Sequence, residues 1–270
     1  MLETIKETAE YLLKKVPNRP QVAIILGTGL GELASHITNK VEIPYTEIPN
    51  FPISTVEGHS GKLIFGKLGD KDIMAMQGRF HYYEGYDMKQ VTFPIRVMKA
   101  FGIKTLFLSN AAGGMNPSFQ VGDLMVIRDH INLFPDHPLR GKNNEELGPR
   151  FPDMSEPYAH KYIKLAFEIA KKNNIKLQKG VYVGTSGPTF ETPAEYRYFS
   201  IIGGDAVGMS TVPEVIVARH SGIECFAISV ITDLGVIGQV EQVSHEEVQK
   251  AAAEAQPNMT FIMKEIINNI

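Results

Sequence analysis

Hydrophobic and polar positions along the chain follow two distinct periodicities. Residues 2–16 place apolar side chains at helical spacing and end in two lysines, which predicts an amphipathic helix whose charges suit its C-terminal dipole. The run Val-Ala-Ile-Ile-Leu at 22–26 is too short for a helix and apolar on both faces, which predicts a buried central strand. Further buried runs predict strands at 105–109, 124–127, 180–183 and 223–231.

Helical patterns separate these predicted strands. They lie at 88–101, 157–172, 193–202, 213–221 and 244–268. Residues 62–67 and 72–77 predict two strands joined by a tight turn at Gly69-Asp70. Strands that alternate with helices predict an α/β fold around a largely parallel or mixed sheet. Because no linker, repeat or change of composition divides the chain, we expect a single domain over 1–270. The polar stretch 132–153 is longer than an ordinary connection and is typical of a functional or interface loop.

Composition and charge exclude several classes of function. The 270 residues are 43% hydrophobic and 21% charged, and 27 basic against 30 acidic side chains give a net charge of −3. Such a surface offers no broad basic footprint for a nucleic acid or an anionic membrane, so we expect any bound anion to be small and held locally. No apolar stretch reaches the ~18 residues of a membrane span. The N-terminal residues lack the basic start and apolar core of a signal peptide, and the single Cys225 has no disulfide partner. We expect a cytoplasmic protein with a buried, inert thiol.

A glycine-rich segment follows the first predicted strand. Gly27-Thr-Gly-Leu-Gly31 leads into a helical pattern, an arrangement that lets backbone amides approach an anion. A dinucleotide fingerprint requires a glycine at the position of Glu32, and a Walker loop requires a Gly-Lys-Ser/Thr sequence that is absent. Taken alone, the segment is equally typical of a plain turn between a strand and a helix.

The loop after residue 77 concentrates candidate chemistry. Arg79, His81 and Glu84 lie among four aromatic residues and between two glycines. An arginine can bind an oxyanion with two hydrogen bonds, and a histidine can add a proton or a hydrogen bond. Aromatic clusters are often only core, and a lone histidine is often structural. The position at a strand end nevertheless favours a ligand site, because open α/β sheets bind ligands there.

Three other segments resemble ligand loops. Residues 109–114 are small and can bring backbone amides to a ligand, and 208–214 place hydroxyls just before a helix that starts with proline. Residues 187–193 put Phe190 beside Glu191, a pair that can stack on a heterocycle and accept its N–H protons. The alternative is that the hydroxyl residues in these segments simply cap the helices that follow.

Neither a metal site nor an acyl-transfer nucleophile is indicated. The histidines that a metal site would need are scattered, at His59, His81, His130, His137 and His245. None has a cysteine partner or His-Glu-x-x-His spacing, and no Gly-x-Ser-x-Gly elbow is present.

Together these segments resemble the motifs of the purine nucleoside phosphorylases of the trimeric class. The matching segments, in family order, are 26–31, 56–61, 77–85, 110–114, 187–192 and 208–218. The resemblance runs from residue 22 to 248, essentially the whole chain. It implies a single-domain, three-layer α/β sandwich in which helices flank a central mixed sheet.

The resemblance also implies roles for individual residues. Those implied to bind phosphate are Thr28, His59, Arg79, His81, the Ala111 backbone and Ser210. Those implied to bind the nucleoside are Tyr83 and Met209 at the ribose, His245 at its 5′-hydroxyl, Phe190 on the purine face and Glu191 at the N1–H edge. Glu84 is implied to orient His81, the usual role of a carboxylate behind an imidazole. Phe151 is implied to close a neighbouring subunit's site, which would make the protein a homotrimer.

The implied reaction is reversible phosphorolysis in purine salvage. A purine ribonucleoside or 2′-deoxyribonucleoside and phosphate would give free base and (deoxy)ribose 1-phosphate, with phosphate as co-substrate and no metal or other cofactor. Two alternatives from other classes are a nucleoside hydrolase, which would not need the phosphate-binding residues, and a purine-binding protein without catalysis. Phosphate-dependent base release separates all three.

One position departs from the family pattern. Asp233 stands where relatives specific for 6-oxopurines commonly carry asparagine. A protonated Asp233 can donate to N7 and support cleavage of inosine and guanosine, whereas an ionised one suits the 6-amino group of adenine. The Thr-Asp pair there also resembles the methylthioadenosine phosphorylases. Glu191 and His245 favour inosine and guanosine, with adenosine or 5′-methylthioadenosine as the alternative substrate.

Overall fold

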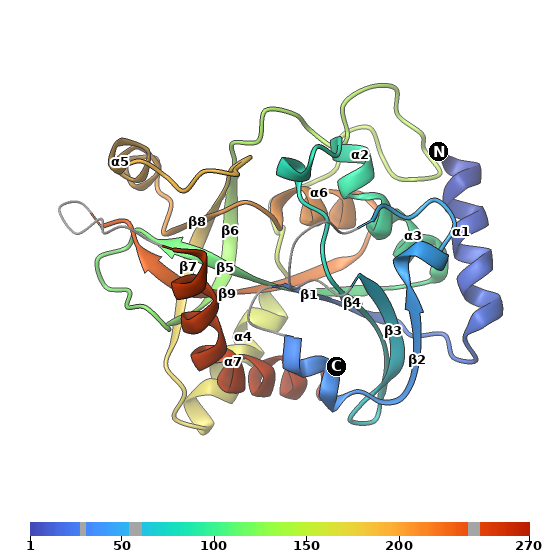
Figure 1. Cartoon of the computed structure of the whole chain (residues 1–270), viewed down its shortest axis with the longest axis horizontal. Coiled ribbons are helices and arrows are strands. Elements are labelled where there is room, and N and C mark those ends of the chain that lie inside the picture. Colours follow the sequence, from blue (N-terminus) through green and yellow to red (C-terminus); the bar gives the residue numbers. More distant parts are fainter. Residues whose placement is uncertain (28–30, 54–60, 237–243) are drawn as a thin grey trace.

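The computed structural model describes residues 1–27, 31–53, 61–236 and 244–270 (Figure 1). Thr28 and His59, both expected at the phosphate, lie outside the described residues. The helices of the described chain are α1 (Leu2–Lys15), α2 (Met88–Val91), α3 (Phe93–Phe101), α4 (His160–Lys172), α5 (Pro193–Ile201), α6 (Val212–His220) and α7 (His245–Asn268). Within this part of the chain, no helix is both long and apolar enough to cross a membrane.

The described strands form one mixed sheet. They are β1 (Val22–Leu26), β2 (Thr38–Pro44), β3 (Lys62–Leu68), β4 (Lys71–Gln77), β5 (Thr105–Gly114), β6 (Leu124–Asn132), β7 (Leu177–Gly184), β8 (Ala206–Gly208) and β9 (Glu224–Leu234). Their order is β2-β3-β4-β1-β5-β8-β7-β6-β9. Strands β4, β1, β5 and β9 are mutually parallel neighbours, whereas β3 is antiparallel to β4, and β8 to β5.

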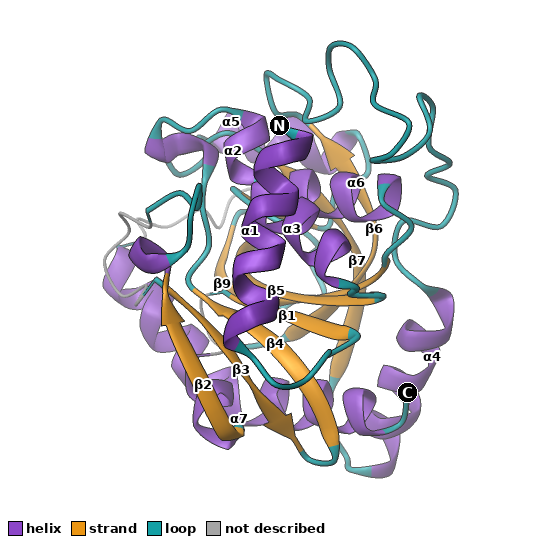
Figure 2. Ribbon diagram, turned by 90° about the vertical axis from the view of Figure 1, so that its right-hand side faces the viewer, coloured by secondary structure: helices purple, strands orange, loops and turns teal. Residues whose placement is uncertain are grey.

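An additional pairing changes the shape of this sheet. Strand β9 pairs with β5 as well as with β6, so β5, β8, β7, β6 and β9 close into a ring. Helices α1, α3 and α6 pack together on one side of the sheet, and α4 and α7 on the other (Figures 1 and 2). The expected mixed sheet flanked by helices is therefore confirmed, while the closed part was not foreseen from the periodicity. The single-domain expectation stays a prediction.

Most predicted elements match the structure closely. All five side chains of β1 are buried, as its apolar run indicates. The predicted helix at 88–101 is two helices, because the chain breaks at Thr92 and α3 starts again with Pro94 in its first turn. The residues after Gly27 were expected to form a helix, but the described part is a short 3₁₀ helix, Gly31–His36. Strand β2 was missed because its side chains are mostly exposed and show no apolar alternation.

Candidate active site

A pocket opens where the carboxyl ends of the parallel strands meet. It has a volume of about 140 Å³ and is lined by residues at or just beyond the last residues of β1, β4, β5, β8 and β9. Of the residues singled out from the sequence, its lining includes Arg79, His81, Tyr83, Ala111, Phe190, Glu191, Met209, Ser210 and Asp233. The parallel strands β4, β1, β5 and β9 direct their carboxyl ends to one edge, and the short antiparallel β8 pairs with the end of β5 there, which explains how segments far apart in sequence meet.

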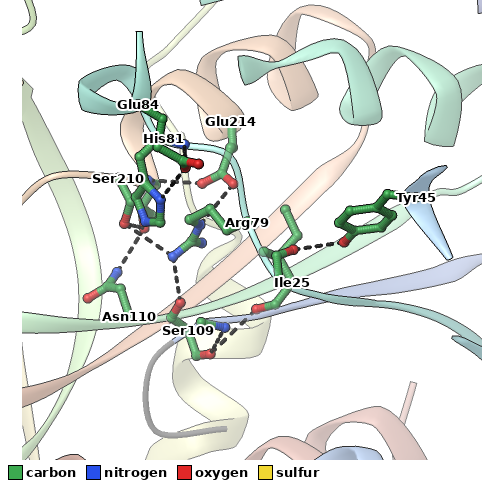
Figure 3. Close-up of polar contacts among 12 residues, drawn as sticks. Ile25, Tyr45, Arg79, His81, Glu84, Ser109, Asn110, Ser210 and Glu214 are labelled. Carbon is green, nitrogen blue, oxygen red and sulfur yellow. Dashed lines mark hydrogen bonds and ion pairs between the residues drawn. The ribbon is translucent and has the colours of Figure 1, made fainter. Parts of the chain in front are cut away.

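Arg79 is the arginine that lines the pocket. Its side chain is only 2% exposed, and its Nε donates to Glu214 Oε1 at 3.0 Å (Figure 3). Its Nη1 donates to the Ser109 carbonyl at 2.9 Å and to Ser210 Oγ at 3.2 Å. Its Nη2 is buried and has no hydrogen-bond partner among the described residues. A buried N–H without a partner is costly, so Nη2 is suited to an acceptor that arrives with the substrate.

The backbone around Arg79 leaves room for this charge. A Cβ added at Gly27 would collide with the Ser109 carbonyl and lie 2.9 Å from Arg79 Nη1. Only glycine lets the end of β1 approach so closely. The position of Gly27 therefore reflects close packing against β5 and the arginine, and the choice between a ligand loop and a plain turn for this segment stays a prediction.

Glu214 fixes both Arg79 and the helix that follows Ser210. Its Oε2 accepts a hydrogen bond from the Thr211 amide at 2.9 Å, while its Oε1 accepts from Arg79. Thr211 has a φ of 68°, a conformation that is costly for a residue with a branched Cβ. Asn110 Nδ2 donates to Thr211 Oγ1 at 2.8 Å and helps hold this turn. Sequence analysis did not assign a role to Glu214, although its spacing of three from Thr211 is that of a capping box.

His81 is oriented by its own loop. Glu84 Oε1 lies 3.0 Å from His81 Nδ1 and accepts a hydrogen bond from the His81 amide at 2.7 Å. The Tyr83 ring stacks on the imidazole with centroids 4.7 Å apart. Burial raises the pKa of Tyr83 to about 12, with a further contribution from the Glu84 charge, so its hydroxyl remains protonated at neutral pH. Glu84 itself does not line the pocket and acts through the histidine.

The other end of the pocket carries two carboxyl groups. Asp233 Oδ2 accepts a hydrogen bond from Tyr196 Oη at 2.8 Å, and Oδ1 accepts one from Thr232 Oγ1 at 3.0 Å. Burial raises the pKa of Glu191 to about 7, and the negative charge of Asp233 contributes to the increase. Burial also raises the pKa of Tyr196 far above its ordinary value, so this phenol remains a donor. Tyr196 and Thr232 were not singled out from the sequence.

Two residues implied by the resemblance lie outside the pocket lining. His245 is exposed at the start of α7, with its Nε2 2.9 Å from Gln249 Nε2, and α7 contributes Val248 to the lining instead. Phe151 is 87% exposed in the long loop after β6 and does not line the pocket of its own chain. Among the described residues, no three His, Cys, Asp or Glu side chains are grouped so that they could hold a metal ion.

Comparison with known proteins decides the family. The profile of the Phosphorylase superfamily matches residues 21–268. Purine nucleoside phosphorylase 1 of Geobacillus stearothermophilus is 50% identical over 268 residues, which covers 98% of this chain and 97% of that protein. The chain belongs to the purine nucleoside phosphorylase family. The purine nucleoside phosphorylase of Mus musculus is also 50% identical, over 98% of this chain and 95% of its own length.

Solved structures of the purine nucleoside phosphorylase family share the fold. A Schistosoma mansoni purine nucleoside phosphorylase in complex with inosine superposes with a TM-score of 0.94 at 43% identity, over 100% of this chain and 97% of that one. A second structure of the Schistosoma mansoni enzyme, in complex with adenosine, gives a TM-score of 0.93 at 44% identity, over 98% and 96%.

Proposed function

We propose that this chain catalyses the reversible phosphorolysis of purine nucleosides in purine salvage, with inorganic phosphate as co-substrate. The observation that carries the proposal is the buried Arg79, which lines the same pocket as Glu191 and Asp233 and whose Nη2 has no hydrogen-bond partner among the described residues. A hydrolase that uses water, or a purine-binding protein, has no need of such a cation. The relatives named purine nucleoside phosphorylase support the same reaction.

The reaction requires an anion and a nucleoside in one dry pocket. As the C1′–N9 bond breaks, the ribose gains positive charge and the bonding electrons move to the base. A phosphate oxygen then bonds to C1′, which gives ribose 1-phosphate or its 2′-deoxy analogue. Arg79 and Ser210, which are hydrogen-bonded to each other, are the proposed phosphate donors, and fixed donors in a buried site supply both position and electrostatic stabilisation. Because side chains supply these interactions, the proposed reaction needs no metal or other cofactor.

The roles that the resemblance implies for the other residues form part of the proposal. The ring of His81, fixed by Glu84, and the Ala111 backbone complete the phosphate end. Tyr83 and Met209 are proposed to contact the ribose, and Phe190 the face of the purine. Thr28, His59 and His245 are proposed to act at the phosphate and at the 5′-hydroxyl.

Glu191 and Asp233 together determine which purine is accepted. A 6-oxopurine needs an acceptor at N1–H and a donor at N7, which an ionised Glu191 and a protonated Asp233 provide. Adenine needs a donor at N1 and an acceptor at its 6-amino group, which a protonated Glu191 and an ionised Asp233 provide.

Inosine and guanosine are the proposed main substrates, and adenosine is the second candidate. With a pKa near 7, Glu191 is partly ionised at neutral pH, and the ionised form is the one that 6-oxopurines require. Tyr196 and Thr232 donate hydrogen bonds to Asp233, so its oxygens act as acceptors, which supports adenosine. Schistosoma mansoni purine nucleoside phosphorylase has been solved with each of these two nucleosides, consistent with a pocket that holds either.

The experiment is base release from inosine, guanosine and adenosine, each with and without phosphate. We expect hypoxanthine and guanine only when phosphate is present, and slower release of adenine. Adenine release at an equal or greater rate would replace the main substrate by adenosine, and 5′-methylthioadenosine would be tested next. Base release without phosphate would contradict phosphorolysis.

A homotrimer is part of the same proposal. Phe151 is a fully solvated aromatic side chain on a long polar loop, and burial against a neighbouring subunit would remove this exposed ring from water. Sedimentation of the intact protein should give three chains per particle. Phe151→Ala should raise the KM for inosine, while the KM for phosphate changes little.

A further inference from the structure

A second cavity lies on the side of the sheet that carries α1, α3 and α6. It has a volume of about 260 Å³ and opens between α2, α3, the C-terminal end of α6 and the long loop after β6. Its lining includes four cationic side chains, Lys89, Arg96, Arg140 and Lys142. No aspartate or glutamate is among the described residues that line it. The cavity is therefore strongly basic, although the protein as a whole carries a net charge of −3.

The deepest of these cations, Arg96, is bound only by neutral groups. Its side chain is 8% exposed, and its Nη1 lies 3.1 Å from the Leu147 carbonyl, 2.8 Å from Ser221 Oγ and 2.8 Å from His220 Nδ1. A guanidinium can only donate, so His220 Nδ1 accepts and the imidazole is neutral. Within the described chain, no hydrogen bond engages Nε or Nη2 of Arg96.

The described residues offset little of the positive charge in the cavity. Burial lowers the pKa of Arg96 to about 10, and no carboxylate of the described chain counteracts that effect. Among the ion pairs of the described residues, none includes Lys89 or Lys142, and Arg140 reaches Asp136 only at 3.7 Å. A buried charge is costly unless it is paired, so this cavity is electrostatically suited to an anion from outside the chain.

We propose that the cavity is a second anion site, which binds a phosphate dianion either free or carried by a small phosphate monoester. The planar guanidinium of Arg96 matches two phosphate oxygens, and the two flexible lysines at the rim can reach the same group. Phe93 and Leu139 provide an apolar wall for the carbon part of an ester. No motif in the sequence indicated this site, because its cations come from α2, α3 and the loop.

This site is separate from the phosphate end of the nucleoside pocket. Both sites lie near α6, but at opposite ends: Arg79 of the nucleoside pocket is bound to Glu214 in the first turn of α6, whereas His220, which lines the second cavity, is its last residue. A helix of nine residues is about 13 Å long, which places the two anions well apart. The proposed site therefore does not depend on the proposed function.

The test counts bound phosphate by equilibrium dialysis of the intact protein with labelled inorganic phosphate. We expect two phosphates per chain in the wild type and one in the double variant Lys89→Gln/Lys142→Gln. Both lysines are exposed, so neither substitution threatens folding. The matched control, Lys171→Gln/Lys172→Gln, removes two exposed lysines from the last turn of α4 and should still bind two.

Turnover of inosine in the same proteins separates this proposal from the proposed function. We expect the Lys89→Gln/Lys142→Gln protein to retain wild-type turnover. If only one phosphate binds to the wild type and the lysine variant loses it, the second site holds and the active-site assignment fails. If that single phosphate persists in the lysine variant, or if two persist there, the second site is refuted.

A further arm identifies the natural source of the anion. Glycerol phosphate, a small monoester, is added to the wild type with labelled phosphate bound. The concentration of glycerol phosphate that displaces one of the two labelled phosphates is compared with the concentration of unlabelled phosphate that does the same. A concentration at least tenfold lower for glycerol phosphate would assign the site to phosphate esters. Weaker displacement would assign it to inorganic phosphate.

Discussion

Tyr196 donates a hydrogen bond from Oη to Asp233 Oδ2 at 2.8 Å and so joins α5 to the end of β9 inside the nucleoside pocket. An added Cβ on Gly113 would lie 2.8 Å from both of these atoms, so the backbone of β5 leaves just enough room for the pair. In this contact Asp233 is the acceptor, which is the role that suits the amino group of a 6-aminopurine. The proposed base preference should therefore depend on Tyr196 as well as on Asp233.

Removal of the tyrosine hydroxyl should shift preference toward inosine. In Tyr196→Phe, the arrangement in which Asp233 acts as an acceptor loses one of its two supporting hydrogen bonds, so the arrangement in which Asp233 donates to N7 of hypoxanthine becomes relatively more favourable. Loss of one such hydrogen bond corresponds to about 1 kcal/mol, or roughly a fivefold rise in the inosine-to-adenosine ratio of kcat/KM. The measurement is steady-state kinetics with both nucleosides at saturating phosphate.

Tyr198→Phe is the control for that experiment. Tyr198 lies on the same helix, is 52% exposed and does not line the pocket. Its substrate ratio should equal that of the wild type. An unchanged ratio in Tyr196→Phe would show that the hydrogen bond does not influence base preference.

Asp233→Asn should raise the inosine-to-adenosine ratio of kcat/KM more than Tyr196→Phe does. An amide supplies a permanent donor to N7 and O6, so we expect the inosine-to-adenosine ratio to rise about tenfold or more. Because Tyr196 acts through Asp233, the double variant Tyr196→Phe/Asp233→Asn should show little further change. Kinetics of the two single variants and the double variant test this. Additive effects would mean that the two residues influence the base independently.

Arg79 should be required for turnover, and Glu214 should be required to hold the Arg79 side chain in position. Arg79→Met removes the donor proposed for phosphate, and we expect kcat/KM for phosphate to fall at least about tenfold, or 1.4 kcal/mol. The same change leaves the buried Glu214 unpaired, which should also lower the free energy of unfolding by several kcal/mol. Glu214→Gln in the Arg79→Met background replaces that charge with a neutral amide.

The double variant separates the two effects. Arg79→Met/Glu214→Gln should recover part of the lost unfolding free energy, as measured by urea denaturation, without recovering activity. Wild-type turnover in either folded protein would contradict the phosphate assignment.

The sequence was sufficient for much of this site, and the reason is topological. Arg79, Ala111 and Asp233 each lie just beyond a run that predicts a strand, and parallel strands bring their carboxyl ends together. The hydrogen bonds that other side chains make to those residues could not be predicted from the sequence in the same way. Tyr196 meets Asp233 across 37 residues, and that contact depends on where α5 packs against the closed part of the sheet.

The strands β2 and β8 and the role of Glu214 were not predicted because the local sequence patterns there are weak. The strand β8 has only three residues, and β2 is an exposed edge, so neither shows a periodicity that could identify it. Glu214 sits at a capping-box position, and its second role as the partner of Arg79 requires two segments 135 residues apart to meet. Local patterns thus predict elements, and long-range packing decides which side chains face one another.

The raised pKa of Glu191 predicts a pH dependence of base preference. Below pH 7 the carboxyl is increasingly protonated and donates to N1 of adenine, and above pH 7 it is ionised and accepts from N1–H of hypoxanthine. The inosine-to-adenosine ratio of kcat/KM should therefore rise as pH increases through about 7. Parallel kinetics between pH 5.5 and 8.5 test this. Glu191→Gln removes the titrating group, and its ratio should stay flat over the same range.

The raised pKa of Glu191 should also make the free energy of unfolding depend on pH. Most carboxyl groups have a lowered pKa in the folded state and stabilise it as pH rises, whereas Glu191 should destabilise it. The ordinary pKa of glutamate, 4.5, applies to the unfolded chain, and burial raises the folded value for Glu191 to about 7. Between these values the folded state binds more protons than the unfolded state, so the free energy of unfolding falls as pH rises. Full ionisation in the buried site would cost up to about 3 kcal/mol. Urea denaturation at pH 5 and pH 8 should show a smaller loss for Glu191→Gln than for the wild type, and equal losses would place the carboxyl in solvent.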